Sequence, residues 1–206
     1  MRNKKGSFLI AIGVILVLSS AGLFGYNLIE EKNAKRSSER AAVLLGEQII
    51  IKAEDKIYEN AAETVIEDYI LNPEMEMPIE EIDGTEYIGT LEIPKIGLLL
   101  PVINEWSYPN LKIAPCRYFG SVYLDNMVIA GHNYKAHFRE LESLFTGDEV
   151  IFTDVDGNKF CYIIGAKEVL PPTAVEEMTA GEWDFTLFTC NATGTYRIAI
   201  RCDKIG

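Results

Sequence analysis

The hydrophobic positions of this 206-residue chain change their spacing twice along the sequence. Residues 8–26 contain no charged side chain, residues 30–71 place apolar side chains at helical spacing among Glu and Lys, and from residue 87 onward short β-branched runs alternate with turns. These three patterns are typical of a membrane span, an amphipathic helix and β-strands, in that order. We therefore expect three parts, residues 1–29, 30–86 and 87–206.

The first part is expected to be a basic tip followed by a transmembrane signal anchor. At ~1.5 Å per residue, residues 8–26 reach across about 30 Å, the thickness of the hydrocarbon core of a bilayer. Three basic residues precede this run and Glu30 and Glu31 follow it, so the positive-inside rule places the N-terminus in the cytoplasm and the later residues outside the cell. The length of the run favours an uncleaved anchor; a signal peptide cleaved near Ala21 is the alternative.

The second part is expected to be an acidic helical stalk over residues 30–71, followed by a linker over residues 72–86 that contains Pro73 and Pro78. A stalk that only lifts the next domain off the membrane is the favoured interpretation. Packing of its apolar stripe on that domain or on a partner helix is the alternative. The stripe consists of Ile50, Ala53, Ile57 and Ala61.

The third part is expected to be mainly β, a closed or nearly closed eight-stranded barrel with short helices, because many short strands with few long helices favour a barrel. Residues 154–158 contain an Asp-Gly step that predicts a hairpin turn, and they lack the spacing of an EF-hand loop. The expected strands are residues 90–93, 98–103, 122–123, 127–130, 149–153, 159–165, 186–190 and 196–202.

Charge and cysteine content narrow the function classes. The net charge of −12 divides into +3 for residues 1–29, −10 for residues 30–90 and −5 for residues 91–206. This distribution indicates a solvated acidic stalk, and the absence of a basic patch argues against a nucleic-acid partner. The four cysteines form no Cys-x-x-Cys pair or zinc motif, and whether Cys116, Cys161 and Cys202 form a disulfide or stay reduced is left open.

The candidate chemistry lies near the C-terminus. Residues 186–190 read Thr-Leu-Phe-Thr-Cys, a predicted strand that ends in the Cys190 thiol, and a loop with Asn and Gly leads to Arg197 at the start of the next strand. His132 follows the apolar run 127–130, so it should emerge at a strand end. A thiol nucleophile, an imidazole that exchanges its proton and a cation that holds an acyl oxygen are the groups that cysteine-based acyl transfer needs.

The hairpin register distinguishes the two arginines of the last strand. If Cys190 lies opposite Arg197, then Thr186 lies opposite Arg201. Arg201 would then be on the order of 13 Å further along the sheet, too far to reach a carbonyl attacked at Cys190. Arg197 is therefore the catalytic candidate.

Several motifs resemble those of one family. The strand ending in Thr-Leu-Phe-Thr-Cys190, the Gly-His132-Asn133 step after an apolar strand and the arginine that opens the last strand resemble the sortases, membrane-anchored cysteine transpeptidases of Gram-positive bacteria. Residues 87–102, 138–141 and 147–150 also resemble segments of that family. The resemblance covers residues 87–202 and implies that residues 87–206 are the catalytic β-barrel domain.

The resemblance also implies a reaction. Cys190 would attack the Thr-Gly bond of a C-terminal sorting signal of the Leu-Pro-x-Thr-Gly type on a secreted protein. The thioacyl intermediate would pass to an amino group of a peptidoglycan precursor, which would anchor the protein to the cell wall. His132 would exchange protons with the two amines, and Arg197 would hold the oxyanion. Thr189, Asn133 and Trp183 are candidates for positioning substrate. No cofactor is implied, and a calcium ion of the kind that some relatives use is not readable from the sequence.

Other interpretations remain beside this one. His137 is expected on the surface or in local packing. Residues 170–185 are expected to form the specificity loop, and a plain surface connection is the alternative. A hydrolytic thiol protease on the same scaffold, or a non-enzymatic module that binds peptide tails at the cell surface, would share the fold. A pilus-polymerase type is disfavoured because the sequence lacks an Asp-Pro-aromatic lid and a second apolar span.

Overall fold

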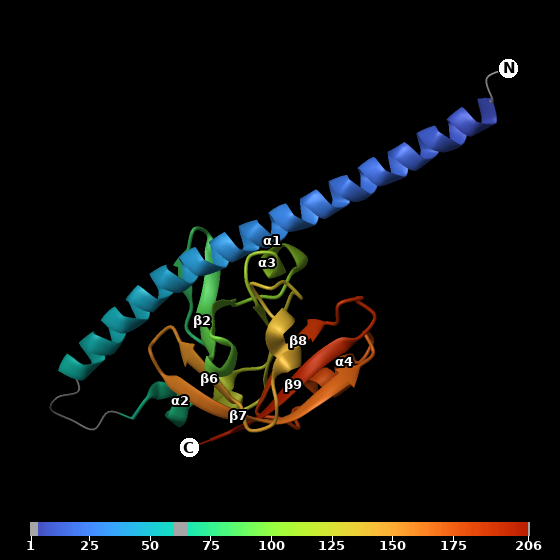
Figure 1. The fold of residues 1–206 in the computed structure, drawn as a ribbon. Helices are drawn as coiled ribbons and strands as arrows, with labels where there is room; N and C mark the ends of the chain where they lie inside the picture. Colours follow the sequence, from blue (N-terminus) through green and yellow to red (C-terminus); the bar gives the residue numbers. More distant parts are fainter. Residues whose placement is uncertain (1–3, 60–65, 206) are drawn as a thin grey trace.

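The computed structural model describes residues 4–59 and 66–205. One helix, α1 (Lys4–Glu59), runs along one side of a β-barrel and projects its N-terminal half beyond it (Figure 1). Within the described residues it is the one helix long and apolar enough to cross a membrane, and none of its most apolar window is buried. The apolar run and the predicted stalk are therefore one continuous helix.

Eight strands close the barrel, as the sequence pattern predicts. The strand order is β2-β3-β4-β5-β8-β9-β7-β6, and β6 pairs with β2 to complete the ring. A ninth strand, β1, pairs with β2 outside the ring. The strands are β1 (Glu80–Ile82), β2 (Thr85–Ile93), β3 (Leu98–Ile103), β4 (Cys116–Phe119), β5 (Met127–Gly131), β6 (Glu149–Asp154), β7 (Lys159–Leu170), β8 (Phe185–Cys190) and β9 (Arg197–Lys204).

The number of ring strands is confirmed, but two of the expected segments differ. The predicted strand at residues 122–123 is the 3-10 turn η3 (Val122–Leu124), because the Ser121 hydroxyl accepts the N–H of Tyr123 at 3.1 Å and starts a turn. Strand β4 was not predicted, since its sequence Cys-Arg-Tyr-Phe does not alternate between apolar and polar residues. The short strand β1 lies within the predicted linker.

Short helices join the strands. The described residues contain α2 (Asp68–Leu71), α3 (Tyr108–Leu111) and α4 (Val175–Thr179), and the 3-10 helices η2 (Pro94–Ile96) and η4 (Arg139–Ser143). Residues 66–67 are not helical and α2 begins at Asp68, so the prediction of one helix to about residue 71 is wrong near its end. Ala61 of the predicted stripe lies outside the described residues.

The C-terminal half of α1 packs on the barrel, so it is not a free-standing stalk. The predicted stripe is wrong at Ile50, which is 60% exposed, whereas Ala53 of the same stripe faces the barrel, where a Cβ at Gly157 would lie 3.3 Å from the Ala53 Cβ. The packed face contains small side chains and two larger apolar ones, Leu45 and Ile49. These two pack with Tyr87 of β2 and Ile103 of β3 in one buried cluster. Small residues let the helix axis approach the sheet closely. The buried stripe consists of Ala34, Ser38, Ala41, Leu45 and Ile49.

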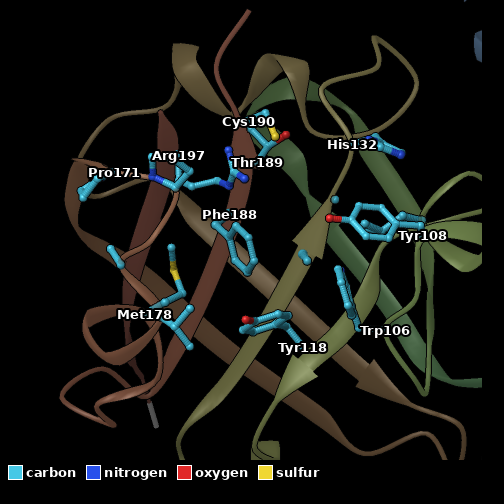
Figure 2. A pocket seen from close by; sticks show the side chains of 16 residues that line it. Trp106, Tyr108, Tyr118, His132, Pro171, Met178, Phe188, Thr189, Cys190 and Arg197 are labelled. Atoms are coloured by element: carbon cyan, nitrogen blue, oxygen red, sulfur yellow. The ribbon is translucent and has the colours of Figure 1, made fainter. Parts of the chain in front are cut away.

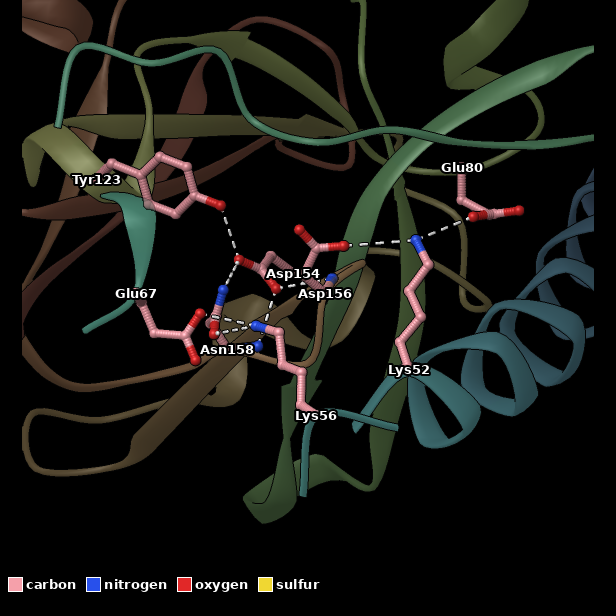
Figure 3. A network of polar contacts seen from close by, with 8 residues as sticks. All are labelled: Lys52, Lys56, Glu67, Glu80, Tyr123, Asp154, Asp156 and Asn158. Atoms are coloured by element: carbon pink, nitrogen blue, oxygen red, sulfur yellow. Dashed lines mark hydrogen bonds and ion pairs between the residues drawn. The ribbon is translucent and has the colours of Figure 1, made fainter. Parts of the chain in front are cut away.

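Ion pairs fix the last turns of α1 to the barrel (Figure 3). The Lys52 Nζ atom lies 3.2 Å from a Glu80 carboxylate oxygen and 3.4 Å from one of Asp156. The Lys56 Nζ atom lies 2.8 Å from a Glu67 oxygen. The helix is thereby attached to β1, to the β6–β7 turn and to the segment before α2.

A buried carboxylate organises the turn that receives these lysines. Asp154 accepts the N–H groups of Asp156 and Asn158 at 2.9 Å each and the Tyr123 hydroxyl at 2.8 Å (Figure 3). Burial raises the pKa of Asp154, against the opposing effect of these hydrogen bonds. Gly157 has a φ of 86°, which suits glycine. The predicted hairpin turn at residues 154–158 is confirmed.

Candidate active site

Cys190 and Arg197 face each other at the loop end of the β8–β9 hairpin. The register pairs Cys190 with Arg197 and Thr186 with Arg201, as the sequence predicts. Asn191 closes the loop, because its N–H donates to the Tyr196 carbonyl at 3.0 Å and its Oδ1 accepts the N–H of Tyr196 at 3.1 Å. The thiol and the guanidinium therefore start from paired positions on adjacent strands.

Strand β5 brings His132 to the same end of the sheet. It runs parallel to β8 with Gly131 paired to Thr189, so His132 and Cys190 each follow a paired residue at neighbouring strand ends. Adjacent strands lie about 4.8 Å apart. Gly131 packs against the Phe138 ring so closely that a Cβ would overlap it. The small residue before His132 is thus a packing requirement.

The His132 imidazole is half-buried and does not point at the thiol. It stacks on the Tyr134 ring with 4.7 Å between ring centroids, and Figure 2 shows it directed away from Cys190. Burial lowers the pKa of His132, the Glu30 carboxylate opposes this effect, and the Lys112 ammonium adds to it. Catalytic hydrogen bonds often form only in the substrate complex. Rotation of the imidazole off Tyr134 would bring it toward the reacting groups.

His137 is a buried packing residue of the same loop. Its side chain is 0% exposed, so the surface interpretation is wrong and the packing interpretation holds. Its ring lies 5.5 Å from that of Tyr134, and neither ring nitrogen has a hydrogen-bond partner within the described residues. Burial lowers the pKa of His137 to about 4. The imidazole is therefore neutral at physiological pH.

Asn133 connects the His132 loop to Cys190. Its Nδ2 donates to the Cys190 carbonyl at 2.7 Å, while its Oδ1 accepts from the Nε of Arg139 at 3.3 Å. Asn133 does not hydrogen-bond to His132 or line the pocket. Its position suits holding the backbone of the nucleophile.

The other two positioning candidates lie in different places. Thr189 is buried, lines the pocket beside Cys190, and its hydroxyl has no partner within the described part of the chain. Trp183 packs on Gly165 of β7, where a Cβ would lie 2.6 Å from the ring. The structure does not bring Trp183 to the pocket.

Arg197 keeps its donors available. Its side chain extends toward Cys190 (Figure 2). It donates only long hydrogen bonds, 3.5 Å to the Gly194 carbonyl and 3.4 Å to that of Tyr196. A guanidinium with uncommitted N–H groups beside a thiol can stabilise an oxyanion.

The candidate catalytic residues line a pocket of about 230 Å³, together with Thr189. They are Cys190, His132 and Arg197. One wall is aromatic, with ring centroids 5.7 Å apart between Trp106 and Tyr118 and 5.3 Å apart between Tyr118 and Phe188. Apart from Phe188, which lies two residues before Cys190, these aromatics come from segments remote in sequence, so the pattern does not predict them. The opposite wall comes from the segment between β7 and β8. It consists of Pro171, Pro172, Ala174, Val175 and Met178.

Helix α1 borders the site where its apolar run ends. The Glu30 carboxylate lies 2.6 Å from the Lys112 ammonium, next to His132. Glu31 accepts the N–H of Lys135 at 2.8 Å and lies 3.7 Å from Arg139. These contacts are long-range and are not predicted by the sequence pattern.

The other cysteines do not reach the pocket. All four cysteines are free thiols, and Cys190 is the one that lines it. Burial raises the pKa of Cys116 to about 12 and raises that of Cys202. Among the described residues no group of three or more His, Cys, Asp or Glu side chains could hold a metal ion. The arrangement favours covalent chemistry at Cys190.

A barrel with a thiol, an imidazole and a guanidinium at one end of a groove defines a candidate cysteine acyl-transfer protein. A profile of the sortase domain matches residues 91–205, more than half of the chain. The chain belongs to the sortase family, whose members are generally cysteine transpeptidases. The chain is similar to sortases A, C1 and D5, so its subclass within the family is unresolved.

Individual relatives agree with this family. The chain is similar to sortase A of Bacillus anthracis, with 26% identity over 132 residues, 61% of this chain and 63% of that protein. It is similar to the crystal structure of sortase C1 from Streptococcus suis at a TM-score of 0.50 and 26% identity, covering 58% of this chain and 73% of that one. A Clostridium perfringens sortase D5 transpeptidase shares the fold at a TM-score of 0.53 and 22% identity, covering 74% and 95%.

Proposed function

We propose that this protein is a membrane-anchored cysteine transpeptidase that cleaves a C-terminal sorting signal of the Leu-Pro-x-Thr-Gly type and transfers the protein to a cell-wall amine. The observation that carries the proposal is the placement of Cys190, His132 and Arg197 at the ends of three adjacent strands, where they line one pocket. Family membership supports the same reaction class.

Each of the three residues has a distinct task. The Cys190 thiol gives its proton to His132, the resulting thiolate attacks the threonine carbonyl, and Arg197 donates hydrogen bonds to the oxyanion that forms. Collapse of the tetrahedral intermediate breaks the C–N bond, while the His132 imidazolium gives its proton to the departing glycine amine. A thioester remains on Cys190. His132 then accepts a proton from the incoming amine, which attacks the thioester and releases the Cys190 thiolate.

The acylation step is tested by mass spectrometry of the full chain with a Leu-Pro-x-Thr-Gly peptide. We expect an adduct on Cys190 equal to the peptide acyl group, complete loss of the adduct in Cys190→Ala, and retention in Cys161→Ala, whose thiol does not line the pocket. Acylation at another cysteine, or activity in Cys190→Ala, would contradict the assignment of the nucleophile.

A hydrolytic thiol protease differs only in what resolves the thioester. Incubation with and without an amine nucleophile separates the two functions. A transpeptidase should form the amide product at the expense of free acid when the amine is added. Free acid in the same amount under both conditions would favour the protease.

The proposed topology divides the chain into residues 1–29, 30–86 and 87–206, with residues 8–26 in the membrane and the barrel outside the cell. The long apolar helix supports an anchor, and the charge asymmetry supports the orientation. Protease added to intact, wall-stripped cells should digest the barrel and leave a short membrane-bound remnant. A soluble mature protein beginning near Gly22 would show a cleaved signal instead.

A further inference from the structure

Arg201 is a buried cation that lies away from the reacting groups. Its side chain is 4% exposed and projects from β9 opposite Thr186, whose hydroxyl accepts its Nη1 at 3.2 Å. Its Nε donates to a Glu168 carboxylate oxygen at 2.8 Å. This ion pair compensates the buried charge, since an unpaired guanidinium there would be strongly destabilising.

The remaining donors of Arg201 go to helix α4. Its Nη2 donates to the Glu177 carbonyl at 2.8 Å and its Nη1 lies 3.5 Å from the Met178 carbonyl. The last carbonyls of a helix lack intrahelical partners, and a cation placed there satisfies them and complements the helix dipole. Arg201 therefore caps the C-terminal turn of α4 from inside the protein.

Helix α4 depends on such contacts for its position. It has five residues, which is too short for a helix to be stable on its own. Besides Arg201, it is attached through Met178, which packs in a small cluster with Val128 and Ala199. Loss of the Arg201 contacts would leave that one buried side chain as its main attachment to the sheet.

The same helix forms one wall of the pocket. Val175 and Met178 line it together with Ala174, and Figure 2 shows Met178 across the pocket from Trp106 and Tyr108. The distance between this wall and the aromatic wall sets which peptide side chains fit. A shift of α4 would therefore change the width of the pocket.

We propose that Arg201 is a positioning residue for peptide selection, which fixes α4 and thereby the width of the groove. The inference rests on the proposed function, because it assigns a task within the same groove. Arg201 acts on binding and not on bond breaking, since four residues of strand place it roughly 13 Å from the Cys190 position.

The test uses the full chain in detergent, with Arg201→Lys and Arg201→Met beside Glu176→Gln as matched control. Steady-state cleavage is measured for Leu-Pro-x-Thr-Gly and Ala-Pro-x-Thr-Gly peptides. We expect KM for the first peptide to rise roughly tenfold in Arg201→Met, with kcat changed by less than about threefold. Preference for the leucine peptide should fall by roughly tenfold, because loosening an apolar pocket removes about that much discrimination.

Arg201→Lys keeps the charge but not the planar fork, so it should fold and show an intermediate rise in KM. Glu176→Gln changes an exposed side chain of α4 that takes part in none of the Arg201 contacts, so it should leave KM and peptide preference unchanged. Faster amide hydrogen exchange confined to α4 should accompany the KM effect in Arg201→Lys. Unchanged KM, preference and α4 exchange in Arg201→Lys would overturn the inference, even if Arg201→Met fails to fold.

Failure of the inference differs from failure of the proposed function. If the unmodified chain forms no acyl-enzyme with any sorting peptide, the proposed function is wrong. If it forms the acyl-enzyme and the Arg201 variants lose activity only in proportion to their folded fraction, Arg201 is a stability residue and the inference is wrong.

Discussion

Arg197 and Arg201 stand on the same strand, yet their surroundings assign them different tasks. Arg197 donates two long hydrogen bonds to loop carbonyls and lines the pocket. Arg201 is buried, and its donors reach Glu168, Thr186 and α4. A group that must meet developing charge needs free donors, whereas a group that holds a fold element has none to spare.

Arg197→Ala is therefore expected to lower kcat by roughly a hundredfold or more, which is the usual cost of losing an oxyanion donor. Lysine should restore little, because an ammonium does not reproduce the guanidinium fork. Steady-state turnover beside thermal unfolding checks this, with Arg201→Lys as the control that keeps its kcat. Near-normal kcat in Arg197→Ala with collapse in Arg201→Lys would reverse both assignments.

The charges beside His132 predict a pH effect of known sign. The Glu30 carboxylate stabilises the imidazolium and raises the pKa of His132, while the Lys112 ammonium lowers it. Glu30→Gln should therefore move the His132 limb of the kcat/KM profile to lower pH, and Lys112→Met should move it to higher pH. Glu39→Gln, on the same helix but paired with Lys35, is the control that should move neither limb. Shifts of the same sign in both variants would contradict the assignment.

At the scale of single residues, the sequence alone selects Cys190, His132 and Arg197 as candidate site residues, because each lies at the start or the end of a predicted strand. The hydrogen bond of Asn133 to Cys190 joins residues 57 positions apart and is not predicted by the sequence pattern. Trp106 and Tyr118 are missed for the same reason. Contacts that form only across the folded sheet leave no local pattern.

At the scale of elements, helix α1 shows that helical spacing alone does not identify the packed face. The predicted stripe combines Ile50, which is exposed, with Ala53, which faces the barrel. The packed stripe contains Ala and Ser because the barrel surface needs a close approach. The strands of the barrel are predicted more accurately than the packed face of α1, because the alternation of apolar and polar residues within a strand is a local pattern. The exceptions are η3, which the pattern predicts as a strand, and β4, which it does not predict.

Leu45 and Ile50 provide a matched pair on the two faces of α1. Leu45 is 0% exposed against the barrel, so Leu45→Ala should weaken docking of the helix by about 2–5 kcal/mol. Ile50→Ala on the exposed face should change stability by less than about 0.5 kcal/mol. Hydrogen exchange and limited proteolysis of residues 34–56 measure the docking. Equal protection in the two variants would show that the helix does not pack as described.

For the molecule as a whole, the continuity of α1 links the proposed anchor to the proposed active site. Glu30 lies four positions after Tyr26, the end of the uncharged run, and at ~1.5 Å per residue this is about 6 Å along the helix. Glu30 and Glu31 already contact the segments around His132. If residues 8–26 span the bilayer, the groove opens close to the membrane surface, where a membrane-retained peptide and a membrane-linked amine can both reach it.

The same continuity predicts where the chain can be shortened. A chain beginning at residue 30 keeps the packed stripe from Ala34 onward and both acidic contacts, so it should be soluble and active. A chain beginning at residue 66 uncovers the apolar surface around Tyr87 and Ile103. That chain should unfold at a lower temperature and tend to aggregate, because a large exposed apolar patch promotes association. Gel filtration, thermal unfolding and peptide cleavage compare the two. If the two chains have the same melting temperature and the same activity, the part of α1 after residue 30 stabilises neither the barrel nor the site, and this prediction is wrong.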